Sequence, residues 1–84
     1  TGTLVGFAAE TENLETNARG KLKRKGCDLV IANDVSRPGI GFDSDRNRVL
    51  LVHPDHTEAL PEDDKDHLAP RIVREIERLA AQRR

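Results

Sequence analysis

The chain has 84 residues, so it forms at most one small domain, with little core to stabilise it. Its 14 basic and 15 acidic residues leave a net charge of −1, which excludes a general electrostatic attraction to nucleic acid or to an anionic membrane. It contains two Phe and no Tyr or Trp, too few aromatic rings to stack along a single nucleic-acid strand.

The cysteine content and the start of the chain indicate the cellular compartment of the protein and whether the sequence is part of a longer one. One cysteine, Cys27, cannot form a disulfide within the chain, and its place beside an apolar run is typical of a reduced cytosolic thiol. Neither a secretory signal pattern nor an apolar stretch of about 18 residues is present, so we expect a cytoplasmic protein. The chain opens on Thr1 without an initiator methionine, and we expect it to be a piece of a longer polypeptide.

The first half of the chain predicts a βαβ unit. Leu4–Ala9 is a short apolar run, typical of a buried strand. Apolar residues recur every four positions within Glu12–Lys25, which predicts a helix that Thr11 can cap and Gly26 ends. Cys27–Ala32 is a second apolar strand. Strand, helix and strand within about 30 residues predict parallel strands and a right-handed crossover.

The second half predicts a β-hairpin, a loop and a helix. Ile40–Phe42 and Arg48–Val52 flank the polar segment Asp43–Asn47, which is the pattern of a hairpin with a polar turn. The polar stretch His53–Asp66 holds two prolines and is predicted to be mainly loop. Apolar residues at helical spacing then predict an amphipathic helix over Lys65–Gln82. The fold class is therefore α/β with a mixed sheet. Because parallel strands need cover on both faces, we expect more chain upstream or a partner subunit.

A basic cluster closes the first predicted helix. Lys21 and Lys25 are four residues apart on one helix face, and like charges at that spacing are mildly destabilising. The cluster favours an anionic partner such as a chain of phosphates. The alternative is a solvated helix end, where the helix dipole stabilises positive charge. Nucleic-acid binding needs a wider basic surface, and the net charge and scarce aromatics oppose it.

Other candidate residues lie near the predicted carboxyl ends of the parallel strands, where open α/β sheets bind ligands. Phe7 there could pack against a base or belong to the core. Asn33 and Asp34 could contact a ribose, a phosphate or a metal-bound water, but both are also common turn formers.

The sequence predicts no metal site. Asp43–Asn47 resembles the start of a calcium loop, but Arg48 stands where glycine is needed and Pro54 where a bidentate glutamate is needed. The three histidines have no cysteine or carboxylate at zinc-binding spacing. We expect them at the surface; they are His53, His56 and His67.

Four segments stand in order along the chain. They are Val5–Thr11 (VGFAAET), Ala18–Lys25 (ARGKLKRK), Asp28–Ser36 (DLVIANDVS) and Gly41–Val49 (GFDSDRNRV). Taken together they resemble one family, phosphopantothenate–cysteine ligase, in bacteria usually the C-terminal half of a bifunctional coenzyme A biosynthesis protein. Leu60–Pro61 before the final helix also fits, and the resemblance covers nearly the whole chain.

The resemblance implies a partial Rossmann-like fold, in which residues 1–84 are the C-terminal fragment of a single nucleotide-binding ligase domain. It implies that the full protein, a homodimer or higher oligomer, uses CTP to join 4′-phosphopantothenate and cysteine through an acyl-cytidylate. Mg²⁺ is the implied cofactor, with its ligands outside this fragment. FMN is implied only in a decarboxylase half, if one is fused upstream.

Matched residue by residue, the family's nucleotide contacts fall on Phe7, Lys21 and Lys25. Asn33 and Asp34 match a family motif at the possible edge of the nucleotide site. Gly20 departs from the larger polar residue that the family more often has. The family's cytidine-reading motif and catalytic lysine belong to upstream segments, so we expect no catalytic residue here and an inactive fragment; CTP and ATP both stay open. The alternative is a non-catalytic assembly or interaction module of a larger α/β protein.

Overall fold

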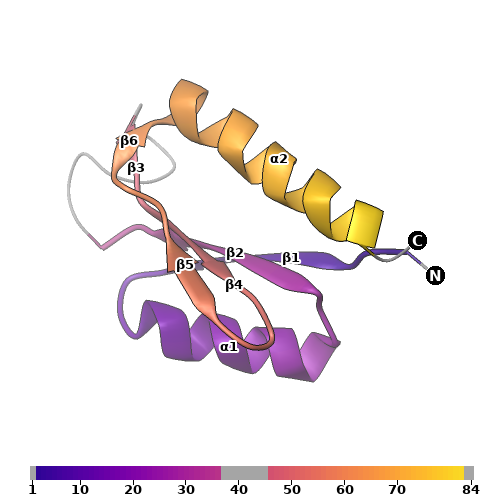
Figure 1. The fold of residues 1–84 in the computed structure, drawn as a ribbon. Helices are drawn as coiled ribbons and strands as arrows, with labels where there is room; N and C mark the ends of the chain where they lie inside the picture. The colour runs from indigo at the N-terminus through magenta and orange to yellow at the C-terminus, as the bar shows by residue number, and fades with distance from the viewer. Residues whose placement is uncertain (1, 37–45, 83–84) are drawn as a thin grey trace.

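The structure is a computed structural model that describes residues 2–36 and 46–82, and it shows a four-stranded mixed sheet between two helices (Figure 1). The spatial strand order is β1-β2-β4-β5, and a separate two-stranded ribbon pairs β3 with β6. This arrangement confirms the α/β class and the mixed sheet. The elements are β1 (Val5–Glu10), α1 (Leu14–Lys25), β2 (Leu29–Asp34), β3 (Arg46–Asn47), β4 (Val49–Val52), β5 (Thr57–Ala59), β6 (Asp63–Asp64) and α2 (Lys65–Gln82).

The predicted βαβ unit is confirmed, with a correction at the helix start. β1 and β2 are parallel, and α1 ends at Gly26, whose φ of 65° is the left-handed conformation that glycine adopts without a steric cost. Thr11 does not cap the helix. Asn13 holds the N-cap position with φ 52°, and no side-chain capping bond forms. Asparagine tolerates this conformation better than most residues, so the backbone turns into the helix two residues later than predicted.

The second half is predicted only in part. Arg48–Val52 contains β4, which pairs antiparallel with β2 and with β5, while Ile40–Phe42 and Asp43–Asp45 lie outside the described residues. The prediction that His53–Asp66 is mainly loop is correct only in part, because the short strands β5 and β6 both form within it. Within residues 46–82 a hairpin joins β4 to β5. The helix over Lys65–Gln82 is confirmed.

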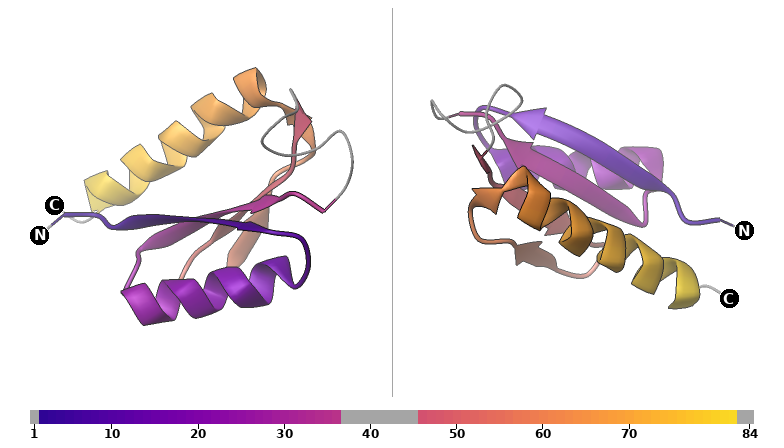
Figure 2. Two further views of the ribbon diagram at one scale, coloured as in Figure 1. Left: turned by 180° about the vertical axis from the view of Figure 1, so that it is seen from behind. Right: turned by 90° about the horizontal axis from the view of Figure 1, so that it is seen from above.

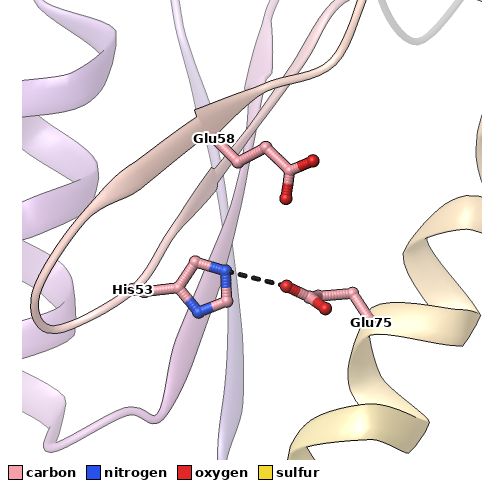
Figure 3. A group of neighbouring side chains, drawn as sticks. All are labelled: His53, Glu58 and Glu75. Carbon is pink, nitrogen blue, oxygen red and sulfur yellow. Dashed lines mark ion pairs between the residues drawn. The ribbon is translucent and has the colours of Figure 1, made fainter.

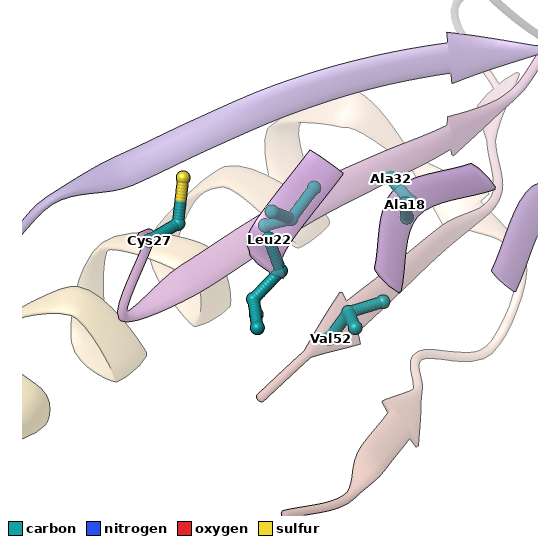
Figure 4. Close-up of a cluster of buried hydrophobic side chains, with 6 residues drawn as sticks. Ala18, Leu22, Cys27, Ala32 and Val52 are labelled. Carbon is teal, nitrogen blue, oxygen red and sulfur yellow. The ribbon is translucent and has the colours of Figure 1, made fainter. Parts of the chain in front are cut away.

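Alternate strand residues build two cores, one on each face of the sheet. α1 covers one face and α2 the other, as the views from behind and above show (Figure 2). On the α1 side the buried cluster is Ala18, Leu22, Cys27, Val30, Ala32 and Val52 (Figure 4). On the α2 side it is Leu29, Ile31, Val49, Leu51, Leu60 and Leu68. β2 is thus covered on both faces, as its continuous apolar run requires.

The sheet has an open edge within the described part of the chain. β1 stands at one end of the strand order and pairs there with β2 alone. Across residues 2–36 and 46–82, neither helix combines the length and apolar character needed to cross a lipid bilayer.

Candidate functional site

A groove of about 450 Å³ lies between α2 and the β1 side of the sheet. Ala9, Asn33 and Val49 form one row of its lining across β1, β2 and β4. Ile72 of α2 contributes to the lining from the helix. The lining is mostly apolar and carries no Asp or Glu among the described residues, so it suits an uncharged flat group better than a phosphate.

Phe7 also lines the groove and is exposed to solvent over 63% of its surface. The interpretation of Phe7 as a core residue is therefore wrong. It is the third of six residues in β1, opposite Ile31 of β2, so it lies mid-strand rather than at the carboxyl end. An exposed aromatic side chain beside an apolar groove is a surface on which a ring can pack.

The backbone of Phe7 faces the open edge of the sheet. The carbonyl groups of Leu4 and Glu10 accept bonds from Asp28 and Val35 at the two ends of β2. Since the backbone groups of successive strand residues alternate in direction, the carbonyl of residue 7 points away from β2. The Nζ of Lys21 donates a hydrogen bond to this carbonyl oxygen. A positive charge from α1 therefore lies at the residue whose ring opens onto the groove.

Gly6 makes room for the buried thiol of Cys27. An ideal Cβ at residue 6 would lie only 3.1 Å from Sγ of Cys27, whereas it would lie an ordinary 3.9 Å from Cε of Lys21. The missing side chain therefore lets the thiol lie against β1, beside the stem of Lys21. Because side chains alternate along a strand, Gly6 faces α1 while Phe7 faces the groove.

The structure thus places two of the three predicted nucleotide contacts at the β1 edge, on opposite faces of the sheet. The Lys21 ammonium bonds the backbone carbonyl of Phe7 from the α1 side, and the Phe7 ring lines the groove on the α2 side. Lys25 is exposed one turn further along, beside Lys23 and Arg24 in the last turn of α1. Its position fits both the phosphate contact and the solvated helix end.

Asn33 and Asp34 have separate roles. Asp34 Oδ1 accepts bonds from the backbone N and the Oγ of Ser36 at 2.9 and 2.6 Å, and its Oδ2 lies 3.6 Å from Nη1 of Arg48. Asp34 is therefore a turn former in this structure. Asn33 lines the groove, and its Oδ1 is buried without a hydrogen-bond partner in the described part of the chain.

The groove does not fit a Mg²⁺ site. Mg²⁺ prefers carboxylate and phosphate oxygens in octahedral geometry. The carboxylate that follows the groove residue Asn33 in the chain, Asp34, is already bonded to Ser36 and paired with Arg48. Two groups elsewhere have metal-ligand chemistry, and sequence spacing did not reveal either. They are His53 with Glu58 and Glu75, and Asp63 with Asp64 and His67.

The prediction of three surface histidines is wrong for His53, which is 2% exposed, and right for His56 and His67. The β4–β5 hairpin and α2 enclose His53, and neither arrangement follows from local sequence. Arg19 holds the hairpin turn against α1: its Nη1 donates to the His53 carbonyl at 2.9 Å and its Nη2 to Thr57 Oγ1 at 2.8 Å.

Residues 1–79 match the family described as the DNA/pantothenate metabolism flavoprotein C-terminal domain. The chain belongs to this family. Members of similar sequence include the coenzyme A biosynthesis bifunctional protein CoaBC of Escherichia coli K12, 48% identical over 87% of the chain, and that of Bacillus subtilis 168, 45% identical over 94%. These matches confirm the resemblance seen in the ordered motifs.

A solved structure agrees with the assignment of the chain to this family. A crystal structure of the C-terminal domain of CoaBC superposes with a TM-score of 0.75 at 33% identity, covering 95% of this chain and 38% of that one. The chain spans only about a fifth of the length of the curated relatives, 18% of the E. coli protein and 20% of the B. subtilis protein.

Proposed function

We propose that this chain supplies one side of the nucleotide site of a coenzyme A biosynthesis enzyme, a ligase that uses CTP to join 4′-phosphopantothenate and cysteine. The names of the CoaBC relatives support the biosynthetic role, and the ordered motifs support the ligase part. The observation that carries the proposal is that the Lys21 ammonium bonds the backbone carbonyl of Phe7 at the open edge of β1, while the exposed ring of the same residue lines the groove.

In this proposal the nucleotide lies across the β1 edge. Its base packs on the exposed ring of Phe7 over the apolar groove. Its phosphates reach over the edge to Lys21 and, one turn further, to Lys25. Charge-assisted contacts of this kind are about twice as strong as neutral ones. The amide of Asn33, whose oxygen lacks a partner among the described residues, offers a polar contact on the groove side.

The proposed reaction has two steps. The phosphopantothenate carboxylate attacks the α-phosphorus of CTP, and pyrophosphate leaves, which gives an acyl-cytidylate. The cysteine amine then attacks the acyl carbon, and CMP leaves. Lys21 and Lys25 hold and neutralise the phosphates while negative charge develops. Mg²⁺ would supply further charge neutralisation on the triphosphate, with ligands outside this chain. The catalytic groups and the base-reading residues also lie outside it, and we place the reaction in the cytoplasm.

The test measures the apparent affinity for CTP in the full-length ligase. Lys21→Ala removes a charge-assisted contact, whose loss is worth about 1.5–3 kcal/mol, so the KM for CTP should rise roughly ten-fold or more. Phe7→Ala should raise it as well. Lys23→Ala is the matched control, because Lys23 is exposed on the same helix but lines a different hollow with Glu15 and Arg19.

Equal CTP affinities in the Lys21→Ala, Lys25→Ala and Lys23→Ala proteins would refute the phosphate role. Running the same assay with ATP decides between the two nucleotides.

A second candidate function is a non-catalytic assembly surface. It is favoured by the open edge of β1 and by the exposed apolar side chains Leu4, Phe7 and Val73, which are 50%, 63% and 52% exposed. Analytical ultracentrifugation separates the two functions. If Phe7→Ala dissociates the oligomer but leaves CTP affinity unchanged, Phe7 serves assembly. If Phe7→Ala lowers CTP affinity but leaves the oligomer intact, Phe7 belongs to the nucleotide site. The full ligase then forms its oligomer through other contacts.

A further inference from the structure

Three side chains from three elements converge on the side of the sheet away from β1. His53 follows the last residue of β4, Glu58 belongs to β5, and Glu75 belongs to α2. Figure 3 shows the three side chains pointing toward one another across the space between the hairpin and the helix. One ligand atom from each lies within 4.8 Å of the other two.

Nε2 of His53 points into this cluster (Figure 3). The residue is 2% exposed, and its Nε2 has no hydrogen-bond partner in the described part of the chain. Oε2 of Glu75 lies 3.1 Å from Nε2, within ion-pair distance but not aligned for a hydrogen bond. Buried nitrogen atoms rarely lack a hydrogen bond, so one that is held by a misaligned ion pair is a candidate ligand for a cation.

The spacing fits two ligands of one small cation. Two donors bound tetrahedrally to Zn²⁺ at about 2.0–2.1 Å lie about 3.4 Å apart. The 3.1 Å between Nε2 of His53 and Oε2 of Glu75 is close to this separation. The carboxylate of Glu58 is the third donor, and because this residue is exposed, an ion can enter from solvent.

Arg78 holds the carboxylate of Glu75 with two hydrogen bonds. Its Nε donates to Oε1 of Glu75 at 2.5 Å and its Nη2 to Oε2 at 2.9 Å. Glu75 can therefore offer Oε2 to an ion and keep Oε1 on the guanidinium, an arrangement that orients the ligand. Arg71 and Arg74 line the same hollow as Glu58 and Glu75. Their charge opposes a cation, so we expect a site of moderate affinity.

We propose that His53, Glu58 and Glu75 bind a divalent transition-metal ion of the Zn²⁺ class, with a fourth position left to water. One nitrogen and two carboxylate oxygens are donors that Zn²⁺ accepts. The ion would link the β4–β5 hairpin to α2. The proposal does not depend on the nucleotide site, which lies at the opposite edge of the sheet.

The test uses Co²⁺ as a spectroscopic probe on the metal-free protein, with the thermal shift by Zn²⁺ as a second readout. We expect visible absorption typical of Co²⁺ with four or five ligands, and a rise in melting temperature with Zn²⁺. EDTA should reverse both the absorption and the rise in melting temperature. Glu58→Gln should weaken Co²⁺ binding roughly ten-fold or more. This exposed substitution leaves the core untouched, so loss of binding cannot be ascribed to unfolding.

His67→Gln is the matched control, because it alters the other acidic cluster, with Asp63 and Asp64, and should leave Co²⁺ affinity unchanged. The proposal is overturned if the unsubstituted protein does not bind Co²⁺. It is equally overturned if Glu58→Gln binds as tightly as the unsubstituted protein, or if His67→Gln removes the binding.

Discussion

Replacing Gly6 with alanine should strain the contact between β1 and the segment that leads into β2. An ideal Cβ at residue 6 lies 3.1 Å from Sγ of Cys27 and 3.6 Å from Cγ2 of Val30. This is tighter than ordinary contacts between such atoms, so the thiol must retreat by a few tenths of an ångström. Cys27 is 7% exposed, and its backbone N is bonded to the Leu22 carbonyl at 2.9 Å, which leaves little room.

Overpacking of this kind costs about 1–3 kcal/mol, and the lower entropy of the unfolded alanine chain offsets about 0.4–1 kcal/mol of it. The net loss is therefore between about 0 and about 2.6 kcal/mol, with a central value near 1 kcal/mol. A domain of this length has a total stability of about 4–13 kcal/mol, so the loss is a measurable fraction of it.

The assay is urea unfolding followed by circular dichroism, on Gly6→Ala, Cys27→Ala and the double variant. If the thiol is the obstacle, Gly6→Ala should cost about 1 kcal/mol less in the Cys27→Ala background. Lys21→Ala is the control, since Cε of Lys21 lies at an ordinary 3.9 Å and its removal should give no such rescue. Additivity of the Gly6 and Cys27 effects within about 0.3 kcal/mol would refute this reasoning.

Two further predictions concern α1 and pH. Gly20→Ala should stabilise the protein by about 1 kcal/mol, because an ideal Cβ at this mid-helix position meets nothing within 4 Å; a melting temperature that does not rise would contradict this. In EDTA, acidification from about pH 7.5 to about 5.5 should destabilise His53→Gln less and His67→Gln more than the unsubstituted protein, as measured by urea unfolding. Burial lowers the pKa of His53, so as pH falls this histidine takes up a proton in the unfolded chain before it does so in the folded one. The bond to Asp63 raises the pKa of His67, so protonation of this histidine favours the folded chain at low pH. Equal pH slopes in all three proteins would count against both assignments.

Local pattern predicts those elements whose burial shows in the sequence. The continuous apolar run in Leu29–Ala32 matches a strand covered on both faces, and the helical spacing of apolar residues in Lys65–Gln82 matches α2. Gly26 ends α1 as expected because a left-handed residue at a helix end has a strong local signal. These features depend on near neighbours in the chain.

The features that local pattern missed depend on distant partners. β5 is Thr57–Ala59, a short polar stretch that becomes a strand because β4 offers it a row of backbone groups. The burial of His53 follows from the same hairpin and from the packing of α2. Its neighbours Glu58 and Glu75 are 5 and 22 positions away in the chain, so no spacing rule could join them.

The candidate nucleotide site is a prediction from motifs, and the fold shows where the residues of that prediction lie. Nothing in the spacing of Phe7 and Lys21 indicates that the ammonium reaches the backbone at the edge of β1 while the ring opens on the other face. The sequence left two alternatives for Asn33 and Asp34, and the bonds of Asp34 to Ser36 resolve that residue as a turn former.

The bond from Lys21 to the Phe7 carbonyl also bears on how the chain avoids unwanted association. The free backbone groups of a strand edge can pair with a strand of another molecule, and a lysine at the edge commonly protects a protein against such pairing. Here that protection uses the same ammonium that we propose binds the phosphates. A nucleotide and the edge carbonyl would then compete for one charge, so an anion that draws Lys21 away would leave the edge free to pair with another strand.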